Sequence, residues 1–303
     1  MHPPRYRVGT ASWTDPTLLA SGFYPPHART AEARLRFYAE HFSTVEVDST
    51  YYALPSERNA ELWAARTPAD FRFNIKAFAL LTGHPAETRA LPQALRAQLP
   101  PEALAQPRLS HPSPAVLRGA FEMFHAALTP LRQARKLGCI LLQFPPWFTA
   151  SARNEAYIDF CRAQLPDSQL AIEFRHASWL NGRAQQTLDF LAARGLSFVC
   201  LDAPQAPSIP RTPYAATSAI AYIRLHGRNR QAWFRRTETA AQRFKYLYTD
   251  DELHDCAARI RAVTTPADRR IETAYVIFNN CYADWGMRNA ATLQGLLGEP
   301  HAA

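Results

Sequence analysis

Residues 139–175 read CILLQFPPWFTASARNEAYIDFCRAQLPDSQLAIEFR, and this stretch decides the fold. It opens on the apolar run Cys139–Phe144 and closes on a second apolar run, Leu170–Arg175, both of strand length. Between them, Ser151–Gln164 has the spacing of an amphipathic helix. A strand, a helix and a strand in this order predict two parallel strands joined by a helical crossover.

The same alternation runs through the whole chain. Six further strand-like runs are Arg7–Trp13, Thr44–Asp48, Phe71–Lys76, Ser197–Asp202, Ala221–His226 and Ala274–Asn279. Helical patterns lie at Thr30–Phe42, Ser56–Arg66, Ala115–Lys136, Arg183–Arg194, Asp250–Val263 and Met287–Leu297, with Thr30 and Ser56 as expected N-caps. Eight such units predict an α/β fold, a single TIM-type (β/α)8 barrel over residues 1–303. Long insertions are expected after strand 3 (Leu81–Pro114) and strand 7 (Gly227–Thr249), and Ala203–Ala219 offers no clear helix.

Composition narrows the class of protein. The chain has 303 residues, 47% hydrophobic, with a formal net charge of +8, which permits an anionic partner. The start MHPPRYRVGT has no signal-peptide pattern, and no apolar run reaches membrane-spanning length. The five cysteines are scattered, which argues against a disulfide framework or a cysteine zinc site. We therefore expect a cytoplasmic protein without a membrane partner.

Polar residues recur on one face of the predicted strands. Because side chains alternate along a strand and the outer face must pack under helices, the polar set is expected to point into the barrel. Its members are Thr10, Ser12, Glu46, Asp48, Arg72, Asn74, Lys76, Gln143, Glu173, Arg175, Asp202, Tyr222, Arg224, His226, Asn279 and the neighbouring Asn280. Most lie late in their strands, at the C-terminal mouth where barrel active sites are built. The alternative is an internal ion network with a purely structural role.

Basic residues gather between Arg211 and Lys245. The eight are Arg211, Arg224, Arg228, Arg230, Arg235, Arg236, Arg243 and Lys245, and Glu238 is the one acid among them. Aromatic Tyr214, Trp233, Phe234 and Phe244 are interleaved with them. The segment predicts an anion-binding lid beside the seventh strand, where barrels often bind phosphate. A solvated basic loop is the alternative.

The residue types favour acid/base chemistry on an anionic ligand. We predict Glu173, Asp48, Lys76 and His226 as catalytic residues, because carboxylates, histidine and a buried lysine exchange protons. Predicted substrate-binding residues are Glu46, Gln143, Arg175, Arg224, Arg228, Asn279 and Asn280. A divalent metal held by Glu46, Glu173, Asp202 and His226 is not favoured, since cations are interspersed among them. The sequence has no P-loop, no GxGxxG after a strand, no HExxH and no GxSxG, so no organic cofactor is indicated.

The order of motifs resembles a known family. GTASW at the start, HFSTVEVDSTYY, FRFNIKA, LLQFPP, AIEFRHASW, AYIRLHGR, LYTDDEL and the closing FNN are similar to the YecE-like family, filed as domain of unknown function 72. The resemblance covers Arg7 to Leu297 and implies a single TIM-type barrel. It implies no reaction, since that family has no established activity.

Three functions remain open on this evidence. The first is an enzyme, a hydrolase or lyase, acting on a phosphorylated or other anionic small molecule at the mouth. The second is a nucleic-acid-binding or nucleic-acid-processing protein that uses segment 211–245. The third is a barrel that binds a small molecule without catalysis.

Overall fold

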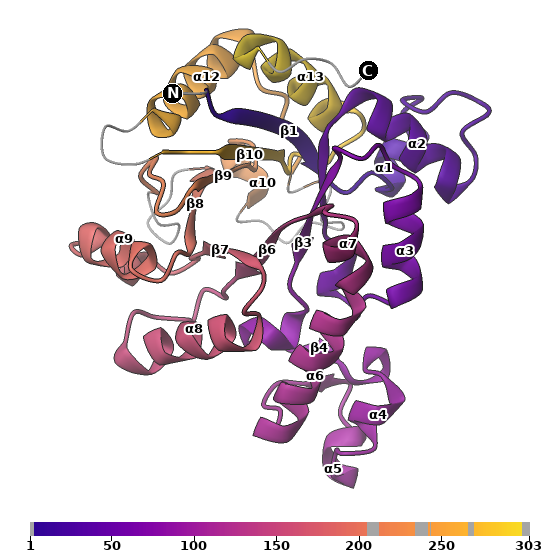
Figure 1. The fold of residues 1–303 in the computed structure, drawn as a ribbon, viewed down its shortest axis with the longest axis vertical. Helices are drawn as coiled ribbons and strands as arrows, with labels where there is room; N and C mark the ends of the chain where they lie inside the picture. The colour runs from indigo at the N-terminus through magenta and orange to yellow at the C-terminus, as the bar shows by residue number, and fades with distance from the viewer. Residues whose placement is uncertain (1–2, 205–211, 234–241, 243, 266–269, 299–303) are drawn as a thin grey trace.

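The fold is a closed barrel of eight parallel strands, as predicted (Figure 1). The computed structural model describes residues 3–204, 212–233, 242, 244–265 and 270–298. The barrel strands are β1 Arg5–Ala11, β2 Thr44–Val47, β3 Arg72–Lys76, β6 Leu137–Gln143, β7 Gln169–Glu173, β8 Ser197–Asp202, β9 Ile220–Leu225 and β10 Thr273–Phe278. Their order around the barrel is β1-β10-β9-β8-β7-β6-β3-β2. Each predicted strand is present within two residues of its expected ends.

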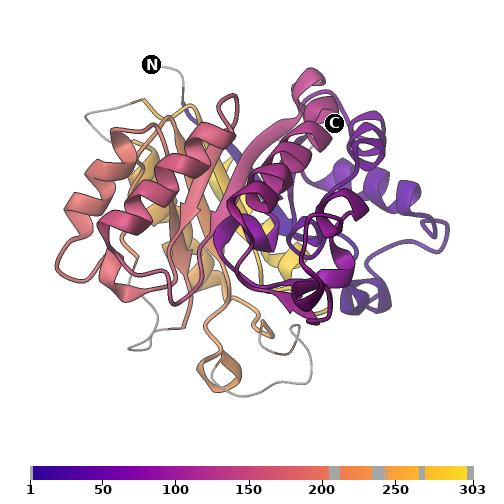
Figure 2. The ribbon, with the colours of Figure 1, turned by 90° about the horizontal axis from the view of Figure 1, so that it is seen from below.

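Helices cover the outside of the ring of strands (Figures 1 and 2). They are α1 Pro16–Ala20, α2 Ala31–His41, α3 Glu57–Ala65, α6 Pro114–Ala127, α7 Thr129–Gln133, α8 Ala152–Gln164, α9 Ala184–Ala192, α12 Asp250–Thr264 and α13 Trp285–Leu297. Both predicted N-caps are confirmed: Thr30 accepts from the amide of Ala33 at 3.0 Å, and Ser56 accepts from that of Asn59 at 3.1 Å. Each such cap is worth about 1 kcal/mol.

The helical pattern at Ala115–Lys136 forms two helices rather than one. Helix α6 ends at Ala127, and α7 begins at Thr129 with Pro130 in its first turn. Proline fits a first turn because it lacks the amide hydrogen that a helix interior requires. The structure thus divides this pattern where the sequence places its proline.

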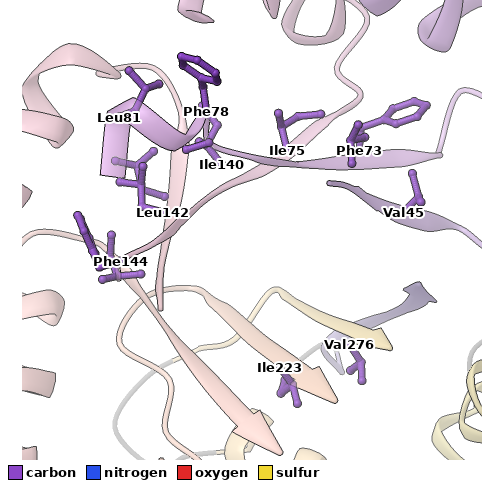
Figure 3. Close-up of a cluster of buried hydrophobic side chains, with 14 of the residues drawn as sticks. Val45, Phe73, Ile75, Phe78, Leu81, Ile140, Leu142, Phe144, Ile223 and Val276 are labelled. Carbon is purple, nitrogen blue, oxygen red and sulfur yellow. The ribbon is translucent and has the colours of Figure 1, made fainter. Parts of the chain in front are cut away.

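The two faces of the barrel strands pack as the alternation predicts. Outward residues, among them Val45, Phe73, Ile75, Leu142 and Ile223, form a large apolar layer beneath the helices (Figure 3). A second, smaller cluster fills the inside of the barrel, with Ala11, Cys139, Leu141, Ala171, Val199, Leu201, Tyr222, Tyr275 and Ile277. The inward polar residues lie beyond it, toward the C-terminal ends of the strands.

Two strand residues expected inside the barrel lie on its outer face. Thr10 exchanges a hydrogen bond with the Tyr38 hydroxyl of α2 at 3.0 Å, because Gly9 and Ala11 take the inward positions of β1. A Cβ on Gly9 would lie 2.1 Å from the carbonyl oxygen of Thr44, so only glycine lets β1 approach β2 this closely. Asp202 shares its face with Phe198 and Cys200 of the outer layer.

Segments between strands differ in length and content. Between β3 and α6 the chain forms 3₁₀ turns η2 Ala79–Thr82 and η3 Thr88–Ala90, short helices α4 Gln93–Arg96 and α5 Pro101–Leu104, and the small hairpin of β4 Ala86–Glu87 with β5 Arg108–Leu109. Figure 1 shows α4 and α5 projecting away from the barrel. Between β9 and α12 the structure describes the short helix α10 Arg230–Trp233. No helix of the described residues is long and apolar enough to cross a membrane.

Candidate functional site

The candidate site lies at the C-terminal ends of the strands. Adjacent strands β2, β3, β6 and β7 bring Glu46, Asp48, Lys76, Gln143, Glu173 and Arg175, whereas β9 and β10 bring Tyr222, Arg224, His226 and Asn279. All of these belong to the predicted inward set. Parallel strands end at the same side of the barrel, so residues far apart in sequence converge there.

Arg224 is at the centre of a buried ion network. Its Nη2 donates to Glu46 Oε1 and its Nη1 donates to Glu173 Oε2, each at 2.6 Å. All three side chains are fully excluded from solvent. Such charge-assisted pairs offset the cost of burial only when they are well aligned. The guanidinium therefore joins β2, β7 and β9 across the barrel.

Glu46 is more easily protonated than Glu173, the other carboxylate of this network. Burial raises the pKa of Glu46 to about 7, against the lowering effect of the Arg224 guanidinium, and the negative charge of Asp48 adds to the rise. The Tyr222 hydroxyl donates to Glu46 Oε2 at 2.8 Å. Burial and the nearby Glu46 carboxylate together raise the pKa of Tyr222, so the phenol stays protonated as a donor.

Glu173 behaves in the opposite way because two cations surround it. Burial alone would raise the pKa of Glu173, but the guanidinium groups of Arg175 and Arg224 outweigh it and hold that pKa below its usual range. Arg175 donates from Nε to Glu173 Oε1. Among the described residues, its Nη2 has only long contacts, 3.4 Å to Gln143 Oε1 and 3.4 Å to His226 Nε2. Glu173 thus stays ionised and holds both guanidinium groups.

His226 is neutral and lies between two guanidinium groups and an amide. Burial, together with Arg224, Arg175 and Lys76, lowers the pKa of His226 well below its usual value. Both guanidinium groups approach Nε2 at 3.4 Å, and Asn279 Nδ2 lies 2.8 Å from Nδ1, so each ring nitrogen faces nitrogen donors.

Lys76 and Asp48 form a looser pair at the rim of the site. Lys76 Nζ lies 3.9 Å from Asp48 Oδ1 and 4.7 Å from the centre of the Tyr51 ring. Their side chains are 13% and 26% exposed, unlike the fully buried pairs beneath them. Within the described part of the chain, neither Lys76 Nζ nor the buried Asp48 Oδ1 makes a hydrogen bond. This pair keeps its hydrogen-bonding capacity.

Arg228 belongs to a separate cluster on the outer side of the mouth. It donates to both oxygens of Asp202, at 2.9 Å from Nε and 2.7 Å from Nη2, and to Glu252 of α12 at 3.0 Å. The Tyr248 hydroxyl donates to the same Asp202 carboxylate at 2.8 Å. Arg228 therefore uses its guanidinium to fasten α12 and the segment before it to β8.

The remaining predicted residues of this region are distributed differently. Asn280 is buried and donates to the Tyr246 carbonyl at 2.9 Å and to Asn289 of α13 at 3.0 Å, so it joins the segment that precedes α12 to α13. Arg211, Arg235, Arg236 and Arg243 of the predicted basic lid, with Phe234, lie outside the described residues. Arg230 is exposed at the start of α10.

The four residues weighed as metal ligands do not converge. Asp202 lies with Arg228 on the outer face, and the Arg224 guanidinium stands between Glu46 and Glu173. Among the residues that the structure describes, no group of three or more His, Cys, Asp or Glu side chains is arranged to hold a metal ion.

Sequence reasoning missed a set of aromatic side chains at the same mouth. Tyr51 and Tyr52 follow β2, His84 follows β3 and Trp147 follows β6. The sequence does contain a signal for these aromatic residues, because Tyr51 and Tyr52 lie shortly after the polar end of a predicted strand in VEVDSTYY. Trp147 likewise lies shortly after the end of a predicted strand in LLQFPPW. Strand alternation carries no information on such loop residues.

The fold and the site define a single (β/α)8 barrel with a polar, ion-paired C-terminal mouth. The family described as "Protein of unknown function DUF72" matches residues 7–303, and the chain belongs to this family. It is 30% identical over 279 residues to the UPF0759 protein YunF of Bacillus subtilis (strain 168), covering 90% of this chain and 88% of that protein. The predicted family resemblance is confirmed.

Solved structures of the same family share the fold. A DUF72 family protein from Thermotoga maritima MSB8 has a TM-score of 0.75 and 28% identity, covering 97% of this chain and 100% of that one. A DUF72 family protein from Enterococcus faecalis V583 has a TM-score of 0.76 and 25% identity, covering 97% and 95%. None of these names states an activity or a ligand.

Proposed function

We propose that this protein is an enzyme that binds a phosphorylated or other anionic small molecule at the barrel mouth and acts on it by acid/base chemistry. The observation that carries the proposal is Lys76, whose Nζ lies at the rim with a carboxylate 3.9 Å away and no hydrogen bond within the described residues. A cation held close to a carboxylate, with donors unused, suits a ligand that brings its own negative charge.

Arg175 supplies the second cation of the proposed anion site. Its Nε pairs with Glu173, its Nη2 has only contacts of 3.4 Å within the part of the chain that the structure describes, and its side chain is 18% exposed. Lys76 and Arg175 both lower the pKa of His84 and of His226, so the two cations lie near the same two histidines. Arg224 and Arg228, predicted from sequence as anion ligands, each already hold two carboxylates, and we assign the anion to Lys76 and Arg175 instead.

Asp48 is the proposed proton-transfer group. It is the mouth carboxylate with exposed surface, and its Oδ1 has no hydrogen-bond partner among the described residues. Glu173, by contrast, is buried, and both of its carboxylate oxygens accept hydrogen bonds from arginine. In a hydrolase or lyase reaction, Asp48 would take a proton from water or from the substrate, while Glu173 keeps the two guanidinium groups in place.

Anion binding tests the first half of the proposal. Inorganic sulfate and phosphate are titrated into the protein by calorimetry, with the variants Lys76→Met and Arg175→Met. We expect each variant to lose about 10-fold or more in affinity, since a charge-assisted hydrogen bond is worth about 1.5–3 kcal/mol. Arg72→Met is the matched control, because Arg72 lies on the same strand and parity at the opposite end of the barrel. Equal affinities in all four proteins would reject the site.

Turnover tests the second half. A panel of phosphorylated sugars, nucleotides and small carboxylic acids is screened, and any active substrate is tested with Asp48→Asn. We expect a loss of about 100-fold or more in kcat and no loss of anion affinity, because the substitution removes a negative charge beside Lys76. An Asp48→Asn variant that binds anions and leaves every rate unchanged would reject Asp48 as the proton-transfer group, and anion binding without turnover of any compound would support the non-catalytic barrel instead.

Nucleic-acid binding stays a prediction. Of the eight basic residues on which it depends, four lie outside the described residues, and Arg224 and Arg228 are engaged in ion pairs. A steep fall of DNA or RNA affinity with salt, reduced when Arg230, Arg235 and Arg236 are neutralised, would favour it over the small-molecule proposal.

A further inference from the structure

Four aromatic rings form a continuous row at the mouth. Tyr52 contacts Tyr51 with ring centres 5.2 Å apart, Tyr51 contacts His84 at 5.4 Å, and His84 contacts Trp147 at 5.7 Å. The rings come from the loops after β2, β3 and β6, which are neighbours in the barrel. The row therefore follows one arc of the rim.

The two ends of the row are open while its middle is covered. Tyr52 is 68% exposed and Trp147 is 60% exposed, whereas His84 is buried and Tyr51 is half-buried. Burial, with Lys76 and Arg175 nearby, lowers the pKa of His84 to about 4, so the ring is neutral near pH 7. Large aromatic faces left in solvent at both ends of an otherwise packed row indicate a contact surface.

The row passes beside the proposed anion site. Lys76 Nζ lies over the Tyr51 ring at 4.7 Å, so the cation and the aromatic surface are contiguous. Beyond the far end, Trp147 lines a cavity of about 700 Å³ together with Phe148, Tyr157 and Phe160. This volume is within the range of small-molecule pockets, about 300–1,000 Å³.

We propose that one of the two open rings, Tyr52 or Trp147, stacks against a planar heterocycle of the ligand, so that the ligand of this mouth is a nucleotide. The inference deepens the proposed function, on which it rests: Lys76 and Arg175 hold the phosphate, and the open ring holds the base. A flat π-face gains about 1–3 kcal/mol from stacking on an aromatic side chain. A phosphorylated sugar can also lay its C–H face on an aromatic ring, and the comparison with ribose 5-phosphate separates it from a base.

The test compares ligands that share a phosphate and differ in the ring. Adenosine 5′-monophosphate, adenosine 5′-diphosphate and ribose 5-phosphate are titrated into the protein by calorimetry. We expect the better adenosine nucleotide to bind about 10-fold or more tightly than ribose 5-phosphate. In the double variant Tyr52→Ala/Trp147→Ala this advantage disappears and ribose 5-phosphate affinity is unchanged. The single variants then show which ring carries the base.

Controls separate stacking from damage to the fold. Both rings are largely in solvent, and Trp147→Phe keeps a ring, so it should retain most of the nucleotide advantage. Leu104→Ala removes an exposed apolar side chain from α5, in the insertion between β3 and α6, and should change nothing. Nucleotide quenching of tryptophan fluorescence should be reduced in Trp147→Phe, which a purely structural role would not produce.

The outcomes distinguish this inference from the function beneath it. If ribose 5-phosphate binds through Lys76 but the nucleotides bind no more tightly, the stacking subsite is wrong and the anion site stands. If the nucleotides bind more tightly but the double variant keeps the advantage, the base lies elsewhere and the subsite is again wrong. If the advantage depends on Tyr52 or Trp147 but Lys76→Met has no effect, the subsite stands and the anion site fails. Binding of none of these ligands overturns both.

Discussion

The buried network around Arg224 and the rim pair of Lys76 with Asp48 lie at the same end of the barrel, yet they use their charges differently. Both terminal nitrogens of Arg224 donate to carboxylates at 2.6 Å, and the side chains of Arg224, Glu46 and Glu173 are fully excluded from solvent. Lys76 and Asp48 are 3.9 Å apart and partly exposed. Both carboxylates of the network are paired without a ligand, whereas among the described residues the rim pair has unused donors on Lys76 and an unused acceptor on Asp48.

This difference separates two roles that look alike in sequence. Both sets are polar residues late in barrel strands. Buried charges are tolerated only when their partners are in place, so the network forms a fixed polar floor. A rim charge costs little to expose and is available to a ligand. Variants of the floor should therefore change stability, and variants of the rim should change binding.

The largest effect is expected from Arg224→Met. Removing the guanidinium leaves Glu46 and Glu173 buried without their shared cation, which costs about 3–5 kcal/mol in unfolding free energy. Denaturant titration measures it, with Arg72→Met as a control that changes stability by less than about 1 kcal/mol. A loss below 1 kcal/mol for Arg224→Met would mean that the network does not hold the barrel together.

His84 lies in the rim region but is expected to influence stability through pH. Burial, Lys76 and Arg175 lower its pKa to about 4 in the folded protein, from 6.5. Between these values the unfolded chain binds the extra proton, so stability falls as the pH falls. His84→Asn, which keeps a polar partner for Thr82, should lose about 2 kcal/mol less than the wild type between pH 7 and pH 4.5.

Denaturant midpoints at several pH values test this expectation. His111→Asn is the matched control, because His111 is an exposed histidine in the same insertion, and it should follow the wild type. If His84→Asn loses as much stability on acidification as the wild type, His84 is not the group that titrates.

A variant of Arg228 tests whether its cluster with Asp202 and Glu252 contributes to stability, like the buried network, or to anion binding, like the rim pair. Its pairs with Asp202 and Glu252 fasten α12 and the segment before it, and they are partly exposed. Arg228→Met should lower the unfolding free energy by about 1–3 kcal/mol and leave sulfate affinity at Lys76 unchanged. Calorimetry with sulfate decides the matter: a 10-fold loss of affinity would return Arg228 to the anion site where the sequence placed it.

The sequence predicts the barrel well because strand alternation reports burial directly. It separates Ile75 and Phe73 from Lys76 and Asn74, and the structure places them on opposite faces as expected. Strand alternation assigns Thr10 and Asp202 to the wrong face of the barrel. In β8 both faces are apolar, so the alternation carries no information there, and in β1 the close approach at Gly9 decides which face is inward.

The sequence does not predict which polar residues form the buried network around Arg224 and which form the rim pair. Nothing in the order of residues shows that Arg224 reaches both Glu46 and Glu173, since these contacts join β2, β7 and β9 across the barrel. The pairing of Arg228 with Asp202 depends equally on where a loop returns. The aromatic row joins three loops that are distant in sequence, and only the closure of the barrel brings them together.

The smallest expected effect links the two regions. Lys76 lowers the pKa of Glu46, which burial raises to about 7, so the two groups interact. By reciprocity, an anion at Lys76 must raise that pKa, and protonation of Glu46 must favour the anion. Sulfate, which does not titrate near neutral pH, should therefore bind about threefold more tightly at pH 6 than at pH 8. Glu46→Gln should remove this dependence, and a dependence that persists in the variant would show that the floor and the rim act independently.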